Sequence, residues 1–583
     1  MKLKNRIMPF YQAIPKLLTF QVVSFVLLGL LTWGISALCG LLLGLTGKAA
    51  ITSGDMSFIF THWQGYAMIV LLVLMVVAYV AVELNALVIY SSKLLDGEKP
   101  SVWQSIKGGF AAMKKYLNWR GLVVIIYAVV LAPILGLGFS VSLTSSFYMP
   151  RFIMSVIDNT PLYCIGYYVV MALLTVVAII YCFILHGALL DGMTLKEAGA
   201  HSRKLVKRNL KNYIFELLCY LVLATLATVL LTFCAAIPLL IVQLIPMGET
   251  ATIFCDILFT LFPYVVLLFA LLMSVSFFML KLTMLYKKYG SEGEWSYQKQ
   301  EKRRHPFVIT AVVLVLIVCV AVSIVGTISF DEIFHTQITT EVIAHRAGGN
   351  EAPENTVKGI EVAYELGAKG CEIDIQRTSD GHYVVNHDAD FARNCGVSKK
   401  LSEMTLAEVK ELRVDGEPVA TLEEMLDASK DKVILFVELK GETADNRMAD
   451  DAVRIVKEKG MEDQAVLISL KYDVLEYIEQ QYPEMLTGYL SFISLGQIEE
   501  TSFDYLALEE EISTDETIDA VHDKGKLIMV WTVNEKDDIE YFMTSDADAI
   551  ITDSVKMSGE IKQQLSERTP FEIILQKVFS WIQ

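Results

Sequence analysis

Cysteine is scarce where it could carry chemistry. The chain has nine cysteines in 583 residues, and seven of them lie in apolar runs, where cysteine behaves as a small hydrophobic residue. Only Cys371 and Cys395 lie elsewhere, and no Cys-x-x-Cys or mixed Cys/His spacing occurs. This pattern excludes a Cys/His metal module, and a single possible disulfide says little about the redox compartment. The sequence leaves open whether Cys371 and Cys395 pair.

Basic residues are in the minority, and the formal net charge at pH 7 is −17. The imbalance is confined to one part of the chain, because residues 1–340 are net basic and residues 341–583 are strongly net acidic. An acidic surface repels nucleic-acid phosphates, so we expect no nucleic-acid partner. The contrast in charge indicates two different domains.

The N-terminus lacks the features of a removable signal. The segment "MKLKNRIMPFYQAIPKLLTF" is basic, but no small-residue cleavage site precedes the first long apolar stretch. We therefore interpret this segment as a cytoplasmic flank.

Long apolar stretches dominate the first 330 residues. Hydrophobic residues make up 54% of the chain and the mean hydropathy is +0.46, which is rare for a soluble protein. Seven stretches reach the length of roughly 20 residues that a helix needs to cross a bilayer. They lie near residues 18–45, 67–90, 121–143, 162–186, 214–244, 253–282 and 307–329. Residues 1–330 are thus predicted to form a membrane domain with about seven transmembrane helices.

Basic residues in the loops predict the orientation of these helices. The N-terminal flank and the loops after the second, fourth and sixth stretches carry clusters of Lys and Arg. The alternate loops carry only Lys48, then Arg151, then no basic residue. By the positive-inside rule the N-terminus is cytoplasmic. After seven crossings the chain beyond residue 330 is extracytoplasmic, which predicts a multi-pass protein of the plasma membrane.

Two loops of the predicted membrane domain are similar to each other. "LLDGEKPSVWQSIKGGFAAMKKYLNW" begins at Leu94 and "LLDGMTLKEAGAHSRKLVKRNLKNY" begins at Leu189, which indicates a duplicated unit. Each basic stretch is either an interfacial helix held by anionic lipid or an ordinary positive-inside loop, and both interpretations stay open. Of the acids in or near the apolar stretches, Glu83, Glu216 and Asp256, only Glu83 is expected to lie deep. We see no regular array of acids of the transporter kind.

From residue 341 onward, short β-rich runs alternate with amphipathic helical patterns. This alternation over residues 341–560 predicts an α/β fold of the (β/α)8 TIM-barrel type. The eight strands are expected at 341–345, 370–375, 433–439, 465–470, 486–490, 504–508, 526–533 and 547–553. The segment "RTSDGHYVVNHD" adds a hairpin with Asp380-Gly381 as its turn. Residues 331–340 are interpreted as a short linker, and residues 561–583 as a C-terminal amphipathic helix.

Carboxylates gather at the predicted C-terminal ends of these strands, where a TIM barrel builds its active site. Glu372 and Asp374 are two apart on one strand and so face the same side, and Glu438 can join them from the next strand. Buried carboxylates are costly unless they are paired or bound to a metal. Three oxygen ligands without cysteine suit one divalent cation, Mg²⁺ or Ca²⁺.

Cations and histidines complete the candidate site. Arg346 and Lys440 supply positive charge for a phosphate, and His345 and His387 can serve as general acid and general base at neutral pH. This combination is typical of phosphodiester cleavage, whereas a glycosidase needs carboxylates that are free for acid–base work. Each feature alone has a structural explanation, such as a histidine that merely ends a strand. Their convergence at one end of one barrel favours the functional interpretation.

Residues 341–560 resemble the glycerophosphodiester phosphodiesterase family. The matching segments are "HRAGGNEAPENT" (345–356), "EIDIQRTSDGHYVVNHD" (372–388), "VELKG" (437–441), "VWTVN" (530–534) and "AIITD" (549–553). The membrane half resembles the domain fused to some bacterial members of the family. The resemblance implies a TIM barrel that hydrolyses glycerophosphodiesters to glycerol 3-phosphate and an alcohol. One departure is Ala347, where the family usually has glycine.

The same resemblance implies roles for individual residues. It implies that His345 and His387 are the acid–base pair and that Arg346 and Lys440 contact the phosphate. The implied metal ligands are Glu372, Asp374 and Glu438, and the implied lining of the substrate site adds Glu354, Asn355, Trp531 and Asn534.

The predicted function is therefore that of a membrane-anchored, metal-dependent phosphodiesterase. Its predicted partners are the lipid bilayer and a substrate that is a deacylated phospholipid, a lysophospholipid or a glycerolphosphate polymer. Two alternatives stay open: a phospholipase C-like lyase that releases a cyclic phosphate, and a membrane receptor or transporter with a vestigial barrel. The sequence determines neither the head group of the substrate nor the oligomeric state.

Overall fold

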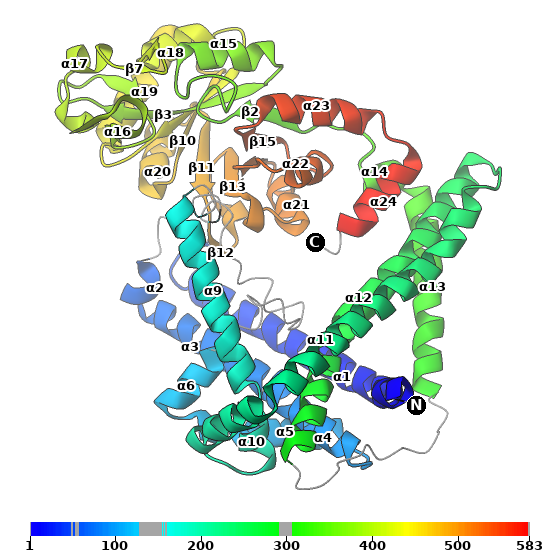
Figure 1. Cartoon of the computed structure of the whole chain (residues 1–583). Coiled ribbons are helices and arrows are strands. Elements are labelled where there is room, and N and C mark those ends of the chain that lie inside the picture. The colour runs from blue at the N-terminus through cyan, green and yellow to red at the C-terminus, as the bar shows by residue number, and fades with distance from the viewer. Residues whose placement is uncertain are drawn as a thin grey trace. The chain divides into compact units, whose positions relative to one another are not determined.

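The chain folds into two compact units in the computed structural model, which describes residues 2–47, 50–52, 57–126, 154, 157, 160–290 and 306–580. The first unit comprises Met1–Cys39, Ala67–Ile328 and Ile574–Gln583, and the second comprises Gly40–Tyr66 and Ser329–Ile573. Long helices build the first unit and a barrel of strands builds the second (Figure 1).

Long helices carry the apolar stretches of the first unit. The helices up to residue 328 are α1 (Lys2–Gly44), α2 (Phe58–Thr61), α3 (Trp63–Tyr79), the π-helix η2 (Val80–Asn85), α4 (Ala86–Leu95), α5 (Val102–Ala112), the 3₁₀-helix η3 (Met113–Tyr116), α6 (Trp119–Ile126), α9 (Pro161–Tyr181), α10 (Ile184–Leu190), α11 (Leu195–Val242), α12 (Glu249–Gly290) and α13 (Pro306–Ile328). Among the described residues, 6 helical segments are long and apolar enough to cross a membrane. They are Met8–Gly44, Trp63–Leu95, Pro161–Leu190, Leu195–Val242, Glu249–Gly290 and Ile309–Ile328. They account for six of the seven predicted stretches, and the other, 121–143, lies mostly outside the described residues.

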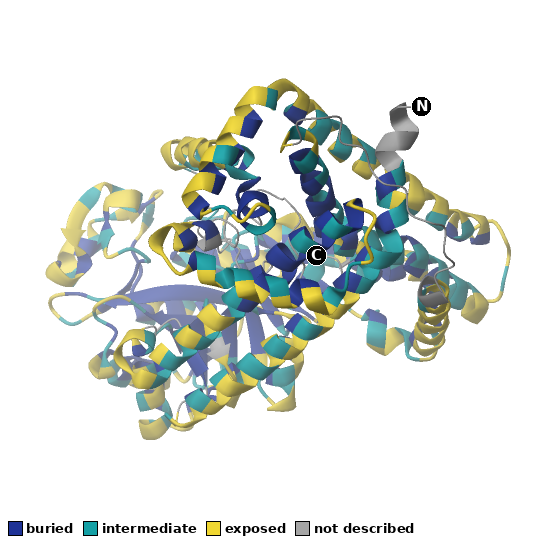
Figure 2. Cartoon of the chain, turned by 90° about the horizontal axis from the view of Figure 1, so that it is seen from below, coloured by how far each residue is buried: buried dark blue, intermediate teal, exposed yellow. Residues whose placement is uncertain are grey.

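The long helices present large apolar side chains on their outer surfaces. On α13, for example, Ile309 is 63% exposed and Ile317 is 59% exposed. Figure 2 shows exposed residues along much of the long helices, whereas the strands of the barrel are coloured as buried. A helix satisfies its backbone hydrogen bonds internally, so such an apolar surface is stable against lipid tails. This surface supports a membrane domain.

The duplicated loops have a structural explanation. In both copies the glycine of Leu-Leu-Asp-Gly has a positive φ, 77° at Gly97 and 70° at Gly192, and lies two residues after the last residue of α4 or α10. The aspartates then bind neighbouring residues of α12: Asp96 accepts from Lys287 at 2.7 Å, and Asp191 accepts from the Tyr286 hydroxyl. The repeated motif therefore ends two helices and fastens both to α12. The binding of anionic lipid by these loops stays a prediction.

The acids near the apolar stretches lie in different surroundings. Glu216 accepts from Lys281 at 2.9 Å, and Asp256 accepts from Gln243 at 2.6 Å. Glu83 is buried on the π-helix η2, and its depth in the membrane stays a prediction. The helix α5 packs across this π-helix at Gly109, where an added Cβ would lie 2.1 Å from the carbonyl oxygen of Ala81.

Eight parallel strands close the barrel of the second unit, as the sequence predicts. In spatial order they are β2 (Glu341–Ala344), β15 (Ala549–Thr552), β14 (Leu527–Trp531), β13 (Tyr505–Glu509), β11 (Thr487–Ser491), β10 (Ala465–Ser469), β9 (Ile434–Leu439) and β3 (Gly370–Arg377), and β3 pairs with β2 to close the ring. The predicted hairpin is also present: β4 (Tyr383–Val385) pairs antiparallel with β3, and Gly381 in the turn has φ 90°. The alternation of side chains along each strand separates an apolar core inside the ring from one outside it.

Helices cover the outside of the ring. They are α15 (Val357–Glu365), α18 (Leu422–Ser429), α19 (Asn446–Lys459), α20 (Tyr472–Gln481), α21 (Asp515–Asp523), α22 (Lys536–Met543) and α23 (Val555–Ser566). An insertion between β4 and α18 has a small apolar core of its own. It contains β5 (Asp390–Phe391), α16 (Ala392–Cys395), β6 (Val397–Lys400), η5 (Leu401–Glu403), α17 (Leu406–Lys410), β7 (Arg413–Val414) and β8 (Glu417–Pro418).

The ends of the second half of the chain differ from the expectation in detail. The predicted linker 331–340 includes the short helix α14 (Phe330–Phe334). The predicted C-terminal helix 561–583 is interrupted, because α23 ends at Ser566 and α24 runs from Pro570 to Ser580. Pro570 has no backbone N–H with which to continue the preceding helix, and Thr569 accepts from the N–H of Glu572 as a helix cap. Cys371 and Cys395 are both free thiols.

Candidate active site

Three carboxylates meet at the C-terminal end of the barrel. Glu372 and Asp374 lie on β3, and Glu438 lies on β9 in register with Asp374. One ligand oxygen from each lies within 4.8 Å of the others, and all three residues are buried. The period of two along a strand places Glu372 and Asp374 on the same face, inside the ring. The structure thus brings together the three residues that the sequence predicts as metal ligands.

Ionisation of all three carboxyl groups would create more negative charge than Lys440 alone can neutralise. Burial raises the pKa of Glu372 to about 7 and the pKa of Glu438 to about 8. Burial also opposes ionisation of Asp374, but the charges of Lys440 and His387 outweigh burial and lower the pKa of Asp374. The Lys440 Nζ lies 2.8 Å from Asp374 Oδ1 and 2.7 Å from Glu438 Oε2. A divalent cation would balance the remaining charge, and oxygen donors of this kind fit Mg²⁺ or Ca²⁺.

His345 follows β2 and is held by a carboxylate from the neighbouring strand. Its Nδ1 lies 2.7 Å from Asp553 Oδ1, directly after β15. Asn534 fixes that carboxylate in turn: its side-chain amide donates to Asp553 Oδ2 at 2.7 Å, and its Oδ1 accepts from the Asp553 backbone N–H at 2.8 Å. Burial lowers the pKa of His345, but the hydrogen bond and charge of Asp553 outweigh it and raise that pKa.

His387 follows β4 and is held in the same way. Its Nδ1 lies 2.8 Å from Asp388 Oδ1, and Arg393 Nε donates to Asp388 Oδ2 at 2.8 Å. Here burial dominates and lowers the pKa of the imidazole, despite the charge of Asp374.

The two histidines therefore share one arrangement. A carboxylate only accepts hydrogen bonds, so each Nδ1 carries the proton that it donates. Each Nε2 is then available to accept a proton from, or donate one to, a substrate. The side chains of His345 and His387 are 20% and 30% exposed, so a substrate can reach them. Two oriented imidazoles at one site are suited to opposite proton transfers.

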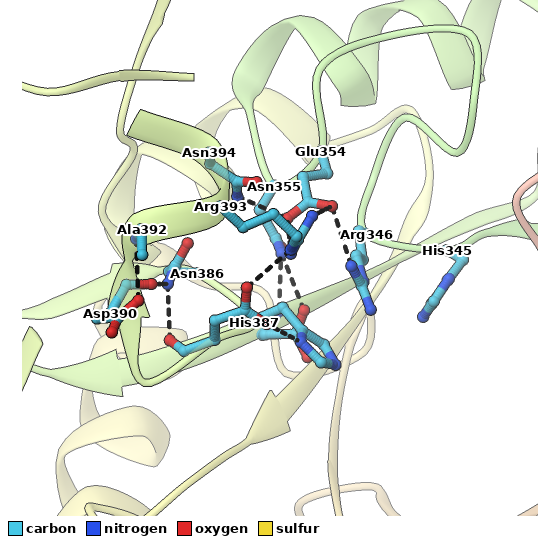
Figure 3. Close-up of polar contacts among 12 residues, drawn as sticks. His345, Arg346, Glu354, Asn355, Asn386, His387, Asp390, Ala392, Arg393 and Asn394 are labelled. Atoms are coloured by element: carbon cyan, nitrogen blue, oxygen red, sulfur yellow. Dashed lines mark hydrogen bonds and ion pairs between the residues drawn. The ribbon is translucent and has the colours of Figure 1, made fainter. Parts of the chain in front are cut away.

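Glu354 links two arginines beside the histidines (Figure 3). It accepts from Arg346 Nη1 at 2.9 Å and from Arg393 Nη2 at 2.7 Å, and the side-chain amide of Asn394 donates to it at 2.7 Å. Burial opposes its ionisation, but these donors outweigh burial and lower the pKa of Glu354 to about 2. The Nε of Arg346 is buried without a hydrogen-bond partner among the described residues. A buried N–H of this kind calls for an acceptor, and a phosphate oxygen is one.

The loop after β2 adopts a strained backbone to present these groups. Arg346, Ala347 and Asn355 have φ of 50°, 65° and 57°. The Asn355 side chain donates to Asp374 Oδ2 at 2.9 Å and accepts from the Asp374 backbone N–H at 3.1 Å. The backbone at Ala347 is left-handed, a conformation that glycine adopts without strain because it has no Cβ atom. Alanine, with a single methyl group, is the smallest residue that can replace glycine there.

Trp531 ends β14 at the same edge of the barrel. Its indole N–H donates to the carbonyl of Ala507 at 2.9 Å, and its register partner on β13 is Glu509, which is buried. The predicted site residues thus lie at or shortly after the C-terminal ends of strands or on the loop that follows β2, except Glu372 and Asp374, which lie in the part of β3 that extends beyond the end of β2.

The sequence prediction assigned no role to Asp553, Asp388, Arg393 and Asn394. Asp388 and Asp553 are the last residues of the segments "NHD" and "ITD", so the sequence already indicated that each lies just after a strand. Their pairing with histidines depends on the fold, because His345 and Asp553 are 208 residues apart.

Comparison with known proteins gives a consistent result for both halves of the chain. The family model "Membrane domain of glycerophosphoryl diester phosphodiesterase" matches residues 3–323, and the model "Glycerophosphoryl diester phosphodiesterase family" matches residues 345–557. A glycerophosphodiester phosphodiesterase of Caldanaerobacter subterraneus is 30% identical over 233 residues, which cover 37% of this chain and 94% of that protein. One of Bacillus altitudinis is 24% identical over 245 residues, which cover 39% of this chain and 99% of that protein. A glycerophosphodiester phosphodiesterase from Parabacteroides distasonis, known from a crystal structure, is 26% identical in sequence. The match covers 39% of this chain and 98% of that chain, with a TM-score of 0.35.

The carboxylate cluster predicts that divalent cations stabilise the folded chain. At a hundredfold excess over the dissociation constant, binding to the folded state alone adds about 2.7 kcal/mol. We expect Mg²⁺ or Ca²⁺ to raise the unfolding temperature of the detergent-solubilised chain by several degrees, as followed by scanning fluorimetry. The increase should be lost in Asp374→Asn and kept in Glu442→Gln, whose side chain is 82% exposed. An equal increase in Asp374→Asn and in the wild type would rule out this metal site.

Proposed function

Because the chain belongs to the glycerophosphoryl diester phosphodiesterase family, we propose that it is a membrane-anchored, metal-dependent hydrolase of glycerophosphodiesters. The observation that carries this proposal is the convergence of two oriented histidines, two cations and three buried carboxylates at one end of the barrel. The products would be glycerol 3-phosphate and an alcohol.

Substrate binding would use the positive charge of Arg346 and Lys440. The Arg346 guanidinium is fixed by Glu354 and keeps a buried N–H without a protein acceptor among the described residues, which suits a phosphate oxygen. Glu372, Asp374 and Glu438 would hold the divalent cation, which supplies Lewis-acid stabilisation of phosphate charge when bound. Lys440 already contacts two of these carboxylates, so it would adjust its position when the cation is present.

Proton transfer would be divided between the two histidines. One Nε2 would accept a proton from the attacking hydroxyl, and the other would donate a proton to the leaving alcohol oxygen as its bond to phosphorus breaks. Asp553 and Asp388 would hold the rings in the required tautomer and stabilise each imidazolium. Asn355 and Glu354 would act as positioning residues, since they contact Asp374 and Arg346.

The attacking group is proposed to be the glycerol hydroxyl next to the phosphate. Its oxygen would bond to phosphorus and expel the alcohol, giving a cyclic phosphate that water then opens to glycerol 3-phosphate. A lyase differs from this scheme only in releasing the cyclic product. The identity of the product therefore separates the two reactions.

The membrane half favours a substrate that is borne on the membrane or the cell wall. Twelve residues separate Ile328, the end of the last apolar helix, from the first barrel strand at Glu341, and an extended residue spans at most about 3.5 Å. This connection limits the distance between the end of the last apolar helix and the first barrel strand to about 40 Å. Of the three candidate substrates on the outer side of the plasma membrane, we propose that a lysophospholipid or a glycerolphosphate polymer is favoured over a deacylated phospholipid, which diffuses freely.

The two-histidine scheme predicts that each imidazole is essential. We expect His345→Ala and His387→Ala to lower kcat at least about a hundredfold, because general acid–base catalysis contributes about 10²–10⁴-fold. His382→Ala, on the turn of the β3–β4 hairpin, is the matched control and should retain wild-type kcat. A kcat for His387→Ala within tenfold of the wild-type value would contradict the scheme.

The carboxylates behind the histidines predict a shift in the pH profile. Asp553 raises the pKa of His345, so Asp553→Asn should lower that pKa and move the corresponding limb of the kcat/KM profile to lower pH. We also expect kcat to fall by at least tenfold while stabilisation by Mg²⁺ or Ca²⁺ is retained. A profile that stays in place in Asp553→Asn would show that this carboxylate does not act on the catalytic histidine.

The function as a whole is tested by assaying the full chain in detergent or in vesicles. Glycerophosphocholine, a lysophospholipid and a glycerolphosphate polymer are each supplied with Mg²⁺, Ca²⁺ or EDTA, and the products are identified by mass spectrometry. We expect metal-dependent release of glycerol 3-phosphate from at least one substrate. A stable cyclic phosphate would identify a lyase, and no turnover on any substrate with metal present would favour a receptor or transporter.

A further inference from the structure

One strand of the barrel lacks its covering helix. Within residues 329–580, all of which are described, six of the eight parallel strands are followed by an α-helix before the next parallel strand begins, and the last strand, β15, is followed by α23. The exception is β11, which is followed only by the short strand β12 (Ser494–Gly496) and the 3₁₀-helix η6 (Ile498–Glu500) before β13. The outer face of β11 therefore needs another element to cover it.

A segment from far up the chain lies at this place. The strand β1 (Ala50–Thr52) pairs antiparallel with β12, with Ala50 opposite Gly496 and Thr52 opposite Ser494. Ala50 belongs to the apolar core outside the barrel ring, Ile51 is 0% exposed and Thr52 is 2% exposed. β1 is thus packed as a part of the barrel, and residues Gly40–Tyr66 belong to the same compact unit.

The contact reaches a buried aromatic cluster on the outer face of β11. The hydroxyl groups of Thr52 and Tyr489 form a hydrogen bond. Tyr489 is fully buried, and its ring centroid lies 5.6 Å from that of Tyr472 and 5.5 Å from that of Phe503. A tyrosine hydroxyl in a core needs a polar partner, and Thr52 supplies one.

We infer that the loop between the first two apolar helices is a docked part of the catalytic domain, in which β1 takes the place of the missing helix beside β11. The barrel is then joined to the membrane half at two places in the sequence, through residues 329–340 and through β1. This inference goes beyond the proposed hydrolysis and does not depend on it.

The docking has a consequence for topology. Two paired strands must lie on the same side of the bilayer, so the chain must cross the membrane an even number of times between Thr52 and Glu341. The seven apolar stretches of the sequence place six crossings in that interval. The pairing of β1 with β12 thus agrees with the even number of crossings that the sequence predicts in this interval.

The docked strand β1 contacts a segment that lies near the edge of the active site. β12 begins three residues after Ser491, the last residue of β11, and three extended residues span at most about 11 Å. The C-terminal end of β11 belongs to the edge of the barrel at which the active site lies. β1 therefore stabilises the segment between β11 and β13 that borders the site.

Cysteine cross-linking in the full chain tests the docking directly. Thr52→Cys combined with Ser494→Cys places two thiols at paired positions, and mild oxidation should give a disulfide-linked peptide pair detectable by mass spectrometry. Thr52→Cys with Ser379→Cys is the control, because Ser379 follows β3, which is three strands away from β11, about 14 Å at about 4.8 Å per strand. A link in the control pair but not in the test pair, or no link in either, would overturn the inference.

Limited proteolysis of two matched variants gives a second measurement. Ile51→Asp places a charge at the buried position, whereas Phe60→Asp makes the same kind of change at a side chain that is 63% exposed in the same loop. We expect the barrel to be cleaved at least tenfold faster in detergent-solubilised Ile51→Asp than in the wild type, with Phe60→Asp unchanged. Equal cleavage of Ile51→Asp and the wild type would overturn the inference, whether or not the chain hydrolyses any phosphodiester.

Discussion

Three carboxylates buried side by side in the mouth of a barrel repel one another, and the rest of the site is arranged around that repulsion. Lys440 contacts two of them, the backbone N–H of Arg346 donates to Glu372, and Asn355 both donates to and accepts from Asp374. These contacts hold the oxygens in place, while burial raises the pKa of Glu372 and of Glu438 and so disfavours their charged forms. Three carboxyl groups held together in this way are suited to a divalent cation, which would favour their ionised forms and would stabilise the charge of a phosphate.

The barrel provides the histidines with partners from separate parts of the chain. β15 lies beside β2, so Asp553 at the end of one strand reaches His345 at the end of the other. Asp388 reaches His387 from the next position in the chain and is itself held by Arg393 from the insertion. Arg393 also holds Glu354, which in turn holds Arg346. The histidine from the hairpin and the loop after β2 are thus fixed to one another by a chain of ion pairs at the barrel mouth.

In both the membrane half and the barrel, short segments connect elements that are far apart in the sequence. The duplicated Leu-Leu-Asp-Gly segments end two helices and fasten them to neighbouring residues of α12. The loop between the first two apolar helices supplies a strand of three residues to the barrel. In the membrane half the connection is made by one aspartate of each motif. In the barrel it is made by the backbone hydrogen bonds of a short strand.

Local periodicity and composition determined much of this protein from the sequence alone. The alternation of apolar β-rich runs with amphipathic helical patterns predicted the eight strands of the barrel, and the Asp380-Gly381 turn predicted the hairpin. The length of the apolar stretches predicted the six long apolar helices among the described residues. The position of polar residues at strand ends also gathered the candidate ligands and histidines, because parallel strands all end at the same edge of a barrel. These features repeat along neighbouring residues, so they can be read without a fold.

Only the tertiary structure decided which distant groups meet. Asp553 lies 208 residues from His345, and Tyr489 lies 437 residues from Thr52. A strand of three residues has no periodicity to detect, and a carboxylate after one strand does not reveal which histidine it will orient. Those contacts arise from the closure of the ring and from the gap left by a missing helix, which are properties of the whole fold rather than of any one segment.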